Sequence, residues 1–258
     1  MFIKSFLLLL AINFLSAGRV PQPEERIIGG KNIEIEDAPW QVSLQEKGEH
    51  YCGGSIYSKD IIITAAHCCF DDDGKKLEAE HLQVRVGSSL KNRNGTLIKV
   101  AAIKSHEYYV HHKFENDIAV MRLSEPLEFS SKVQAIPLAK NNPLPETLAM
   151  TSGWGAVKVK HSQTSPSVDL IIQEHRDRLK STLLSVKSCR EYKGITKDNI
   201  CVYSPGQSVC SADSGGPLVV DNQLVGVTSF AETLCDNVSG FASVPFFRNW
   251  ILNAIEFI

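Results

Sequence analysis

The sequence lacks any large excess of one charge. Its 258 residues include 27 Lys and Arg against 29 Asp and Glu, so the formal net charge is −2 at pH 7. A chain this close to neutral offers no broad positive surface for nucleic acid or for an anionic membrane. Neither is expected as a partner.

The sequence also lacks long apolar runs and internal repeats. Beyond the N-terminal region, no stretch reaches the roughly 20 apolar residues that cross a bilayer. No motif recurs with a period of about 20–50 residues, which excludes a solenoid. The length suits one large domain or two small ones, and such a chain can bury a sizeable core without a structural metal.

The N-terminal region is predicted to be removed during secretion. Lys4 precedes the apolar stretch Phe6–Ile12, and small residues follow it, which is typical of a secretory signal peptide. An uncleaved anchor is the alternative, but the stretch is short for the roughly 30 Å of a bilayer. We assign residues 1–17 to a signal peptide, 18–26 to a polar propeptide and 27–258 to a secreted, extracellular domain.

Cysteines are few but informative. Secretion favours disulfides, and an odd number of cysteines leaves at least one unpaired within the chain. The sequence alone does not fix the pairing. The seven cysteines are Cys52, Cys68, Cys69, Cys189, Cys201, Cys210 and Cys235.

Most of the chain has the short alternating or β-branched segments that are typical of strands. Strands are predicted at 41–44, 61–64, 82–86, 97–103, 118–123 and 224–229. Phe246–Ile258 is predicted to be a helix because its apolar residues recur at helical spacing, and a helical turn or two is predicted within 171–180. Many strands and one terminal helix favour a closed or two-layered antiparallel β fold.

Three segments contain residue types used in nucleophilic catalysis. Ser214 lies in GQSVCSADSGGPL, where the following glycines permit a tight turn that exposes N–H groups beside the hydroxyl. A serine nucleophile needs a base that a third group holds in place. His67 ends the apolar segment IIITAAHC, and Asp117 opens NDIAVMRL. Taken singly, each residue also fits an ordinary turn, a structural histidine or a capping acid, and no spacing joins them.

The segments TAAHC, NDIAVMRL and CSADSGGP, in that order, resemble the trypsin–chymotrypsin family of serine peptidases. RIIGG at 26–30, PWQVSL at 39–44, CGGSI at 52–56 and SGWG at 152–155 match in the same order. The resemblance covers Ile27 to the C-terminus. It implies an all-β fold of two antiparallel six-stranded β-barrels, roughly 27–137 and 138–258, with a cleft between them and a C-terminal α-helix.

The same resemblance implies an endopeptidase that cuts protein and peptide substrates through an acyl-enzyme, without a cofactor or metal ion. Ser214 is the nucleophile, His67 the general base, and Asp117 orients the histidine. The backbone N–H groups of Ala212 and Ser214 form the oxyanion hole. Ala212 departs from the family's glycine and strains this loop, so a slower enzyme is expected. A catalytically impaired homologue that acts as a protein-binding module is the alternative.

The resemblance also assigns the pocket that selects the residue before the cleaved bond (P1). Its residues are Ser208, Ser229, Phe230, Ala231 and Gly240. Ser208 stands at the pocket floor, where trypsin-like members carry an aspartate, so the expected preference is chymotrypsin-like, for Phe, Tyr, Leu or Met. Trypsin-like cleavage is the alternative, since Glu232 lies near the rim.

Activation is implied by cleavage after Arg26, which frees the amine of Ile27 to pair with the buried carboxylate of Asp213. The uncharged pocket does not suit Arg26, so the expected upstream partner is a separate trypsin-like protease. Protease inhibitors are further expected partners, and the enzyme is expected to be a monomer. Asn94 begins the N-glycosylation pattern Asn-Gly-Thr in a polar loop.

Three disulfides carry over from the resemblance: Cys52–Cys68, Cys189–Cys201 and Cys210–Cys235. Cys69 is left over, as a buried free thiol or as half of an intermolecular disulfide. A metal site on His67, Cys68 and Cys69 is not expected, because adjacent residues do not easily converge on one ion.

Overall fold

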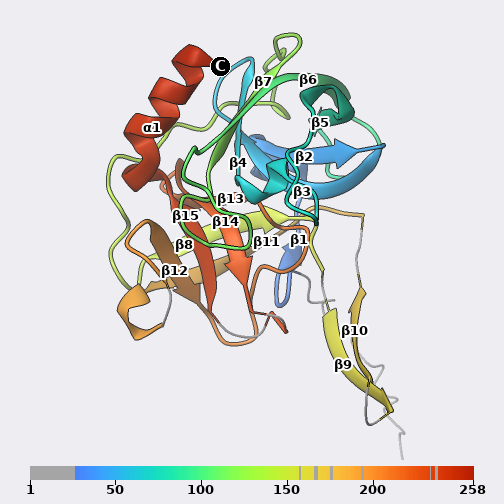
Figure 1. Cartoon of the computed structure of the whole chain (residues 1–258), viewed down its shortest axis with the longest axis vertical. Helices are drawn as coiled ribbons and strands as arrows, with labels where there is room; N and C mark the ends of the chain where they lie inside the picture. The colour runs from blue at the N-terminus through green and yellow to red at the C-terminus, as the bar shows by residue number, and fades with distance from the viewer. Residues whose placement is uncertain are drawn as a thin grey trace, which may run out of the picture.

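The computed structural model describes residues 27–156, 158–165, 168–174, 177–192, 195–232, 234–235 and 238–258. The signal peptide and propeptide assigned to residues 1–26, including Arg26, lie outside the described residues. Figure 1 shows two bodies of strands, one above the other, with an α-helix along one side.

The first body is a closed antiparallel barrel with the strand order β2-β3-β4-β7-β6-β5. Side chains alternate between buried and half-buried along β5, as expected for strands with one face on the core. The strands are β2 (Gln41–Glu46), β3 (Glu49–Ile56), β4 (Ile61–Thr64), β5 (Leu82–Val86), β6 (Thr96–Ser105) and β7 (Ala119–Leu123).

The second body closes in the same way. Its strand order is β11-β12-β15-β14-β13-β8, and pairing between β11 and β8 completes the barrel, while the short β1 (Lys31–Asn32) adds to β11. The strands are β8 (Leu148–Gly153), β11 (Lys180–Lys187), β12 (Asn199–Tyr203), β13 (Pro217–Val220), β14 (Gln223–Ala231) and β15 (Ser239–Ser243). Two closed six-stranded antiparallel β-barrels confirm the predicted fold class.

Strands β9 (Lys158–Ser165) and β10 (Val168–Glu174) form a separate antiparallel hairpin. It projects away from both barrels at the lower right of Figure 1. The helical turn predicted within 171–180 is wrong, because Ile171 and Ile172 pair across this hairpin and Lys180 begins β11. The β-branched residues of this segment favour a strand over a helix, and pairing with the neighbouring strand stabilises that conformation.

Helix α1 (Val244–Phe257) confirms the predicted C-terminal helix. It begins two residues earlier than predicted, because the Ser243 hydroxyl accepts a hydrogen bond from the Phe246 N–H at 3.1 Å and caps the helix. Its apolar face packs against β7, β14 and β15. No helix in the described ranges is long and apolar enough to cross a membrane. Short 3₁₀ helices are η1 (Ile35–Asp37), η2 (His67–Cys69), η3 (Ala79–His81) and η4 (Cys189–Glu191).

All three expected disulfides are present: Cys52–Cys68, Cys189–Cys201 and Cys210–Cys235. Each typically stabilises a fold by about 2–4 kcal/mol, mainly by restricting the unfolded chain. Cys69 is a free thiol and is fully buried. The structure therefore favours the buried-thiol interpretation of Cys69 over an intermolecular disulfide.

The Cys69 thiol is expected to resist modification in the folded protein. Burial raises its pKa to about 12, so almost no reactive thiolate exists at neutral pH. An aromatic disulfide reagent at pH 8 should label no thiol in the native chain and one in denaturant, and Cys69→Ser should label in neither. Rapid labelling of the native chain, or a dimer that reductant separates, would contradict the assignment.

Candidate active site

His67 and Asp117 lie at adjacent positions in the first barrel. His67 begins η2 just after β4, and Asp117 lies two residues before β7, which pairs with β4. One carboxylate oxygen of Asp117 accepts the His67 backbone N–H at 2.9 Å, and the other lies 2.8 Å from the His67 Nδ1. This two-point contact orients the imidazole and leaves its Nε2 as the nitrogen available to act as a base.

Asp117 itself is only 1% exposed and is held from the second barrel as well. The Ser229 hydroxyl, on β14, donates to its Oδ2 at 2.5 Å. Burial alone would lower the pKa of His67, but the charge of Asp117 and its hydrogen bond outweigh burial and raise it. The pair therefore stabilises a protonated imidazole.

Ser214 lies in the tight turn before β13, and barrel contacts hold this turn. Its carbonyl accepts the N–H of Gly53, on β3, at 2.7 Å. Gly215 has φ +76°, and a Cβ there would lie 2.2 Å from the Thr64 Oγ1 and 2.5 Å from the Gly53 carbonyl. No residue larger than glycine fits beside the serine.

Ser214 borders two cavities. One, of about 430 Å³, also contains His67, Asp117 and Ser229 in its lining. The structure places no hydrogen bond between the Ser214 hydroxyl and the His67 Nε2 among the bonds of these described residues. Such contacts are commonly long in free enzymes and shorten when substrate binds.

Ala212 has φ +70°, a left-handed conformation that favours glycine. The strain expected from the alanine is therefore present at this position. Its carbonyl accepts a hydrogen bond from the His50 Nε2 at 3.0 Å, while the His50 Nδ1 lies 2.9 Å from the Ser43 Oγ. In the described part of the chain, the N–H groups of Ala212 and Ser214 donate to no protein acceptor, unlike that of Asp213 between them. Two N–H groups beside the serine are thus available to an oxyanion.

No motif in the sequence indicates a functional role for His50. It directly precedes Tyr51 and Cys52, and only the fold brings it to the loop of Ala212. Its ring also lies edge-on to Trp154, with centroids 5.5 Å apart. Sequence reasoning therefore missed a side chain that fixes the carbonyl of the oxyanion loop.

Asp213 is buried below this loop. Its carboxylate accepts the N–H of Gly155 at 2.8 Å and of Cys210 at 3.0 Å, and burial nevertheless raises its pKa to about 7. Ile27 is 1% exposed, and the next residue, Ile28, bridges to Ser208. The segment after Arg26 therefore packs against the stretch that leads to the nucleophile.

The second cavity beside Ser214 measures about 340 Å³. Glu232 is the one acidic residue among the described residues of its lining, which are Val209, Cys210, Ser211, Ser214, Thr228, Ser229, Phe230, Ala231, Glu232 and Cys235. Ser208 does not line this cavity: it is buried directly before Val209, and its hydroxyl donates to the Val209 carbonyl at 2.8 Å and lies 3.0 Å from the Ser239 hydroxyl. The two hydroxyls next to the Val209 end of this lining are therefore polar and uncharged.

Gly240 is not among the residues that line the cavity, and its neighbour Ser239 is the residue whose hydroxyl lies next to that of Ser208. A Cβ on Gly240 would lie 1.9 Å from the ring of Phe230, which stacks on Phe114 at 4.3 Å between centroids. Gly240 therefore makes room for an aromatic side chain. Sequence reasoning missed Ser239 because the loop before it varies in length, and only the pairing of Ala231 with Ser239 fixes the register.

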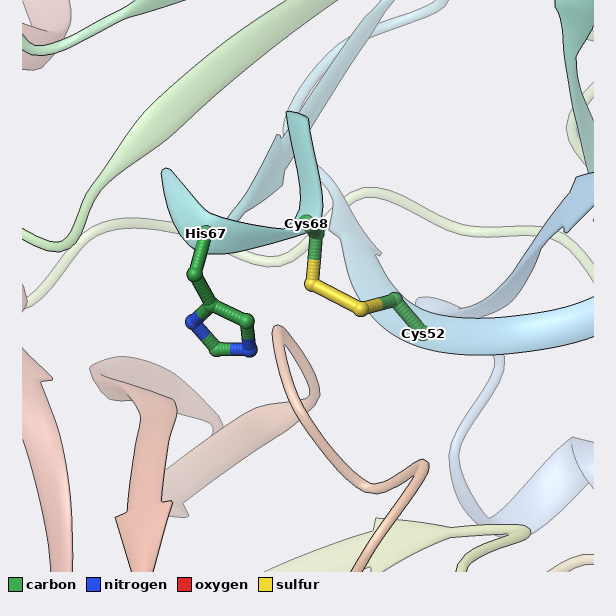
Figure 2. A group of neighbouring side chains, drawn as sticks. All are labelled: Cys52, His67 and Cys68. Atoms are coloured by element: carbon green, nitrogen blue, oxygen red, sulfur yellow. A yellow bond between two sulfur atoms is a disulfide. The ribbon is translucent and has the colours of Figure 1, made fainter. Parts of the chain in front are cut away.

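One group in the described chain brings three metal-ligating residue types together: Cys52, His67 and Cys68, with ligand atoms within 4.8 Å of one another. Figure 2 shows that the two sulfur atoms are bonded as a disulfide, so neither is a thiolate. The His67 Nδ1 is committed to Asp117. This group does not fit a metal ion.

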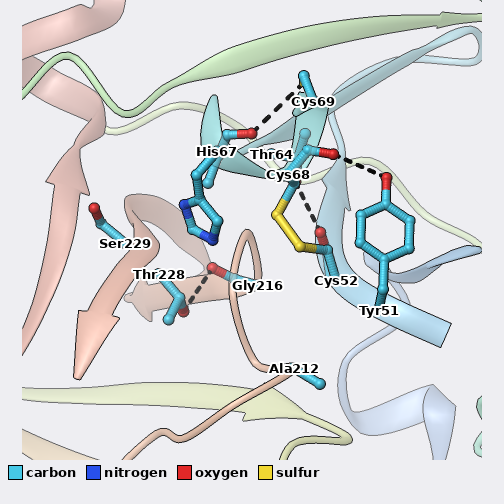
Figure 3. The surroundings of a disulfide bond; sticks show 12 residues. Tyr51, Cys52, Thr64, His67, Cys68, Cys69, Ala212, Gly216, Thr228 and Ser229 are labelled. Atoms are coloured by element: carbon cyan, nitrogen blue, oxygen red, sulfur yellow. Dashed lines mark hydrogen bonds between the residues drawn. A yellow bond between two sulfur atoms is a disulfide. The ribbon is translucent and has the colours of Figure 1, made fainter. Parts of the chain in front are cut away.

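The disulfide instead supports the turn that carries the histidine. Figure 3 shows it beside His67, where the Tyr51 hydroxyl donates to the Cys68 carbonyl at 2.9 Å. The Gly216 carbonyl and Thr228, from the second barrel, are joined by a hydrogen bond of 3.1 Å. Residues of both barrels thus surround the candidate catalytic histidine, His67.

Comparison with known proteins gives a consistent result. The sequence model of the trypsin family, described as Trypsin, matches residues 27–251. Trypsin alpha of Drosophila erecta is 40% identical over 244 residues, which cover 93% of this chain and 92% of the relative. Hypodermin-A of Hypoderma lineatum is 42% identical over 236 residues, which cover 88% of each chain.

A solved structure is similar as well. It is neuropsin, a serine protease expressed in the limbic system of mouse brain, with a TM-score of 0.74 and 27% sequence identity. The match covers 88% of this chain and 98% of that chain.

Two closed barrels with a serine, a histidine and an aspartate at their junction define a class of hydrolases that cut peptide bonds. The chain belongs to the trypsin family and is a serine endopeptidase. Its substrates are accordingly proteins or peptides. Its three disulfides fit an extracellular protein.

Proposed function

We propose that this chain is the secreted precursor of an endopeptidase that is activated by cleavage after Arg26 and prefers a large apolar or aromatic P1 residue. Catalysis follows a Ser-His-Asp acyl-enzyme route. The Ser214 Oγ attacks the scissile carbonyl while the His67 Nε2 takes its proton. Asp117, bonded to the His67 Nδ1 at 2.8 Å, stabilises the imidazolium that forms.

The second half of the reaction uses the same groups in reverse. His67 gives its proton to the departing amine, and the acyl group stays on Ser214. A water molecule then attacks the ester with His67 as base, which releases the acid product and restores the serine hydroxyl. The N–H groups of Ala212 and Ser214 stabilise the negative oxygen in both steps, and the loss of one such donor typically costs about 100-fold or more in kcat.

The P1 preference rests on one observation, the pair of buried hydroxyls of Ser208 and Ser239, 3.0 Å apart, beside Val209 in the lining of the 340 Å³ cavity, where we place the floor of the P1 pocket. An Arg or Lys side chain reaching this depth meets no carboxylate there. Burying a cation without a partner is strongly disfavoured, whereas an apolar side chain gives up no hydration of a charge when it enters the pocket. Ala231 lines the cavity, and its methyl group in place of the family's glycine is proposed to narrow a pocket that favours Phe, Tyr, Leu and Met.

The activated enzyme is expected to cleave a Phe peptide at least about 100-fold better than the matched Arg peptide, as measured by kcat/KM. The reason is that an unpartnered buried charge costs about 3–5 kcal/mol, and each 1.4 kcal/mol is tenfold. The measurement follows cleavage at Arg26 and removal of the activating protease. Ser208→Asp is the matched variant, and it should reduce the Phe-to-Arg ratio at least about tenfold.

Two other results would contradict the proposed P1 preference or the proposed activity. A preference for Arg would contradict the uncharged pocket and favour trypsin-like cleavage directed by Glu232, which lines the cavity. Cleavage of neither peptide, with the Ile27 terminus verified, would favour an impaired homologue that binds proteins, with Ala212 as the cause.

The proposed pocket has a consequence for activation. An enzyme that disfavours Arg at P1 does not efficiently cut after its own Arg26, so a separate trypsin-like protease is the proposed activator. Protease inhibitors that enter the same cleft are proposed as further partners of a monomeric enzyme. Asn94 is exposed in the loop between β5 and β6, which supports its assignment as a glycosylation site.

A further inference from the structure

The backbone that presents Asp117 has an unusual shape. Asn116, directly before it, has φ +57°, and the Ile118 N–H bonds back to the Asn116 carbonyl at 2.9 Å. This three-residue turn has Asp117 at its apex. A change at Asn116 therefore changes where the carboxylate of Asp117 points.

The second barrel holds this turn through one carboxylate. The Asn116 N–H donates to the Asp198 Oδ2 at 2.8 Å, and the Thr196 hydroxyl donates to the other oxygen. Next to it, the Asn199 Nδ2 donates to the Phe114 carbonyl at 3.3 Å. Two adjacent residues at the start of β12 thus grip two points of the loop that carries Asp117.

Asp198 is well placed to act as a fixed anchor. It is 5% exposed, and its own carbonyl accepts the N–H of Ser243, the residue that caps helix α1, at 2.8 Å. In the described structure no Lys, Arg or His forms an ion pair with it. Its carboxylate accepts from an N–H and an O–H donor, and His106 also lies near enough to interact with its charge, so its stabilisation depends in part on holding those donors.

We propose that Asp198 is a positioning residue for catalysis, which fixes Asp117 by holding the N–H of Asn116 across the junction of the barrels. Asp117 then has three anchors: His67, Ser229 and, through the N–H of the preceding Asn116, Asp198. The inference rests on the proposed catalytic role of Asp117. Asp198 touches neither substrate nor the reacting atoms, so it affects the rate through the geometry of Asp117.

The test compares Asp198→Ala with Asp198→Asn in the activated enzyme, with a short Phe substrate. A displacement of about 1 Å at a catalytic group costs about 100-fold. We expect Asp198→Ala to lower kcat about 10–100-fold with KM changed less than about twofold. Asp198→Asn should stay within about threefold of the parent, because an amide oxygen also accepts the Asn116 N–H and its NH₂ can donate to Thr196.

Thr196→Val is the control, since it removes the other donor to the same carboxylate and leaves the Asn116 contact. Its kcat should stay within about threefold of the parent. The melting temperature of each variant is also measured, because it shows whether a lower kcat comes from unfolding or from a displaced Asp117 in a folded enzyme. If Asp198→Ala does not fold, Asp198→Ser, whose hydroxyl is too short to reach Asn116, takes its place under the same criteria.

Three results would overturn the proposal: an unchanged kcat in Asp198→Ala, an asparagine variant no better than the alanine variant, or an equal loss in Thr196→Val. A parent enzyme that cleaves no peptide would instead refute the proposed function. The two failures are therefore distinguishable.

Discussion

Replacing Ser214 with alanine is expected to lower kcat about 10⁶-fold, to the level that binding and the oxyanion loop supply without a nucleophile. The substitution removes the only atom proposed to bond to the substrate carbonyl, and His67 is left with no proton to take. The measurement is hydrolysis of the Phe peptide by the activated enzyme, at concentrations high enough to detect the residual rate.

Ser124→Ala is the control for this experiment. Ser124 is an exposed serine just after β7, and its described contact is the hydrogen bond from its backbone N–H to the Lys99 carbonyl. Its kcat should match the parent. Residual activity above about 1% in Ser214→Ala, with contaminating protease excluded by an inert zymogen preparation, would show that another residue is the nucleophile, because a lost serine costs far more than that.

Asp213→Asn is expected to lower kcat/KM of the cleaved chain about 100–1000-fold. The proposed ion pair between the Ile27 amine and this buried carboxylate holds the loop of Ala212, and breaking a buried pair costs about 3–5 kcal/mol. Arg26→Gln should give a chain that the activating protease does not switch on. Full activity of the cleaved Asp213→Asn enzyme would refute the activation mechanism and leave the catalytic residues unaffected.

The pH range over which stability falls differs before and after cleavage. In the uncleaved chain the pKa of Asp213 is raised to about 7 from 3.8, so the folded state binds its proton more tightly than the unfolded chain does. The stability of the precursor therefore falls as the pH rises from about 4 to about 7, by up to about 4 kcal/mol. Urea unfolding at several pH values measures this, and the Asp213→Asn precursor should lack the slope.

After cleavage the proposed pairing with the Ile27 amine is expected to offset this cost. Pairing raises the amine pKa above its ordinary value of about 8, so the stabilisation is present at neutral pH and is lost as the pH rises through the raised value. Activity should decline over the same alkaline range, and full activity at pH 11 would contradict the ion pair.

The sequence predicted the fold and the candidate catalytic residues because both rest on short contiguous segments. The apolar segment before His67 and the one after Asp117 pair as β4 and β7, which brings the two residues together. The same segments carry the family resemblance. The disulfide pairing followed from that resemblance and not from spacing.

The sequence did not predict contacts that depend on residues far apart in the chain. His50 and Ala212 are 162 positions apart, and Asn116 and Asp198 are 82 apart, so no local pattern relates them. Ser239 was missed for a different reason, because a loop of variable length hid the register of β15 against β14. The β9–β10 hairpin was missed because its charged residues obscured the alternation of a strand.

Because one barrel holds His67 and Asp117 and the other holds Ser214 and Ser229, neither half of the chain contains a complete site. Hydrolysis of a peptide is therefore a direct readout of how well the two halves are docked. A bound protein, a distant substitution or a cut in the connecting segment can shift one barrel against the other by a fraction of an ångström. Any such shift is expected to change the rate of hydrolysis. With the proposed catalytic residues, we expect catalysis only when both halves are present and in register.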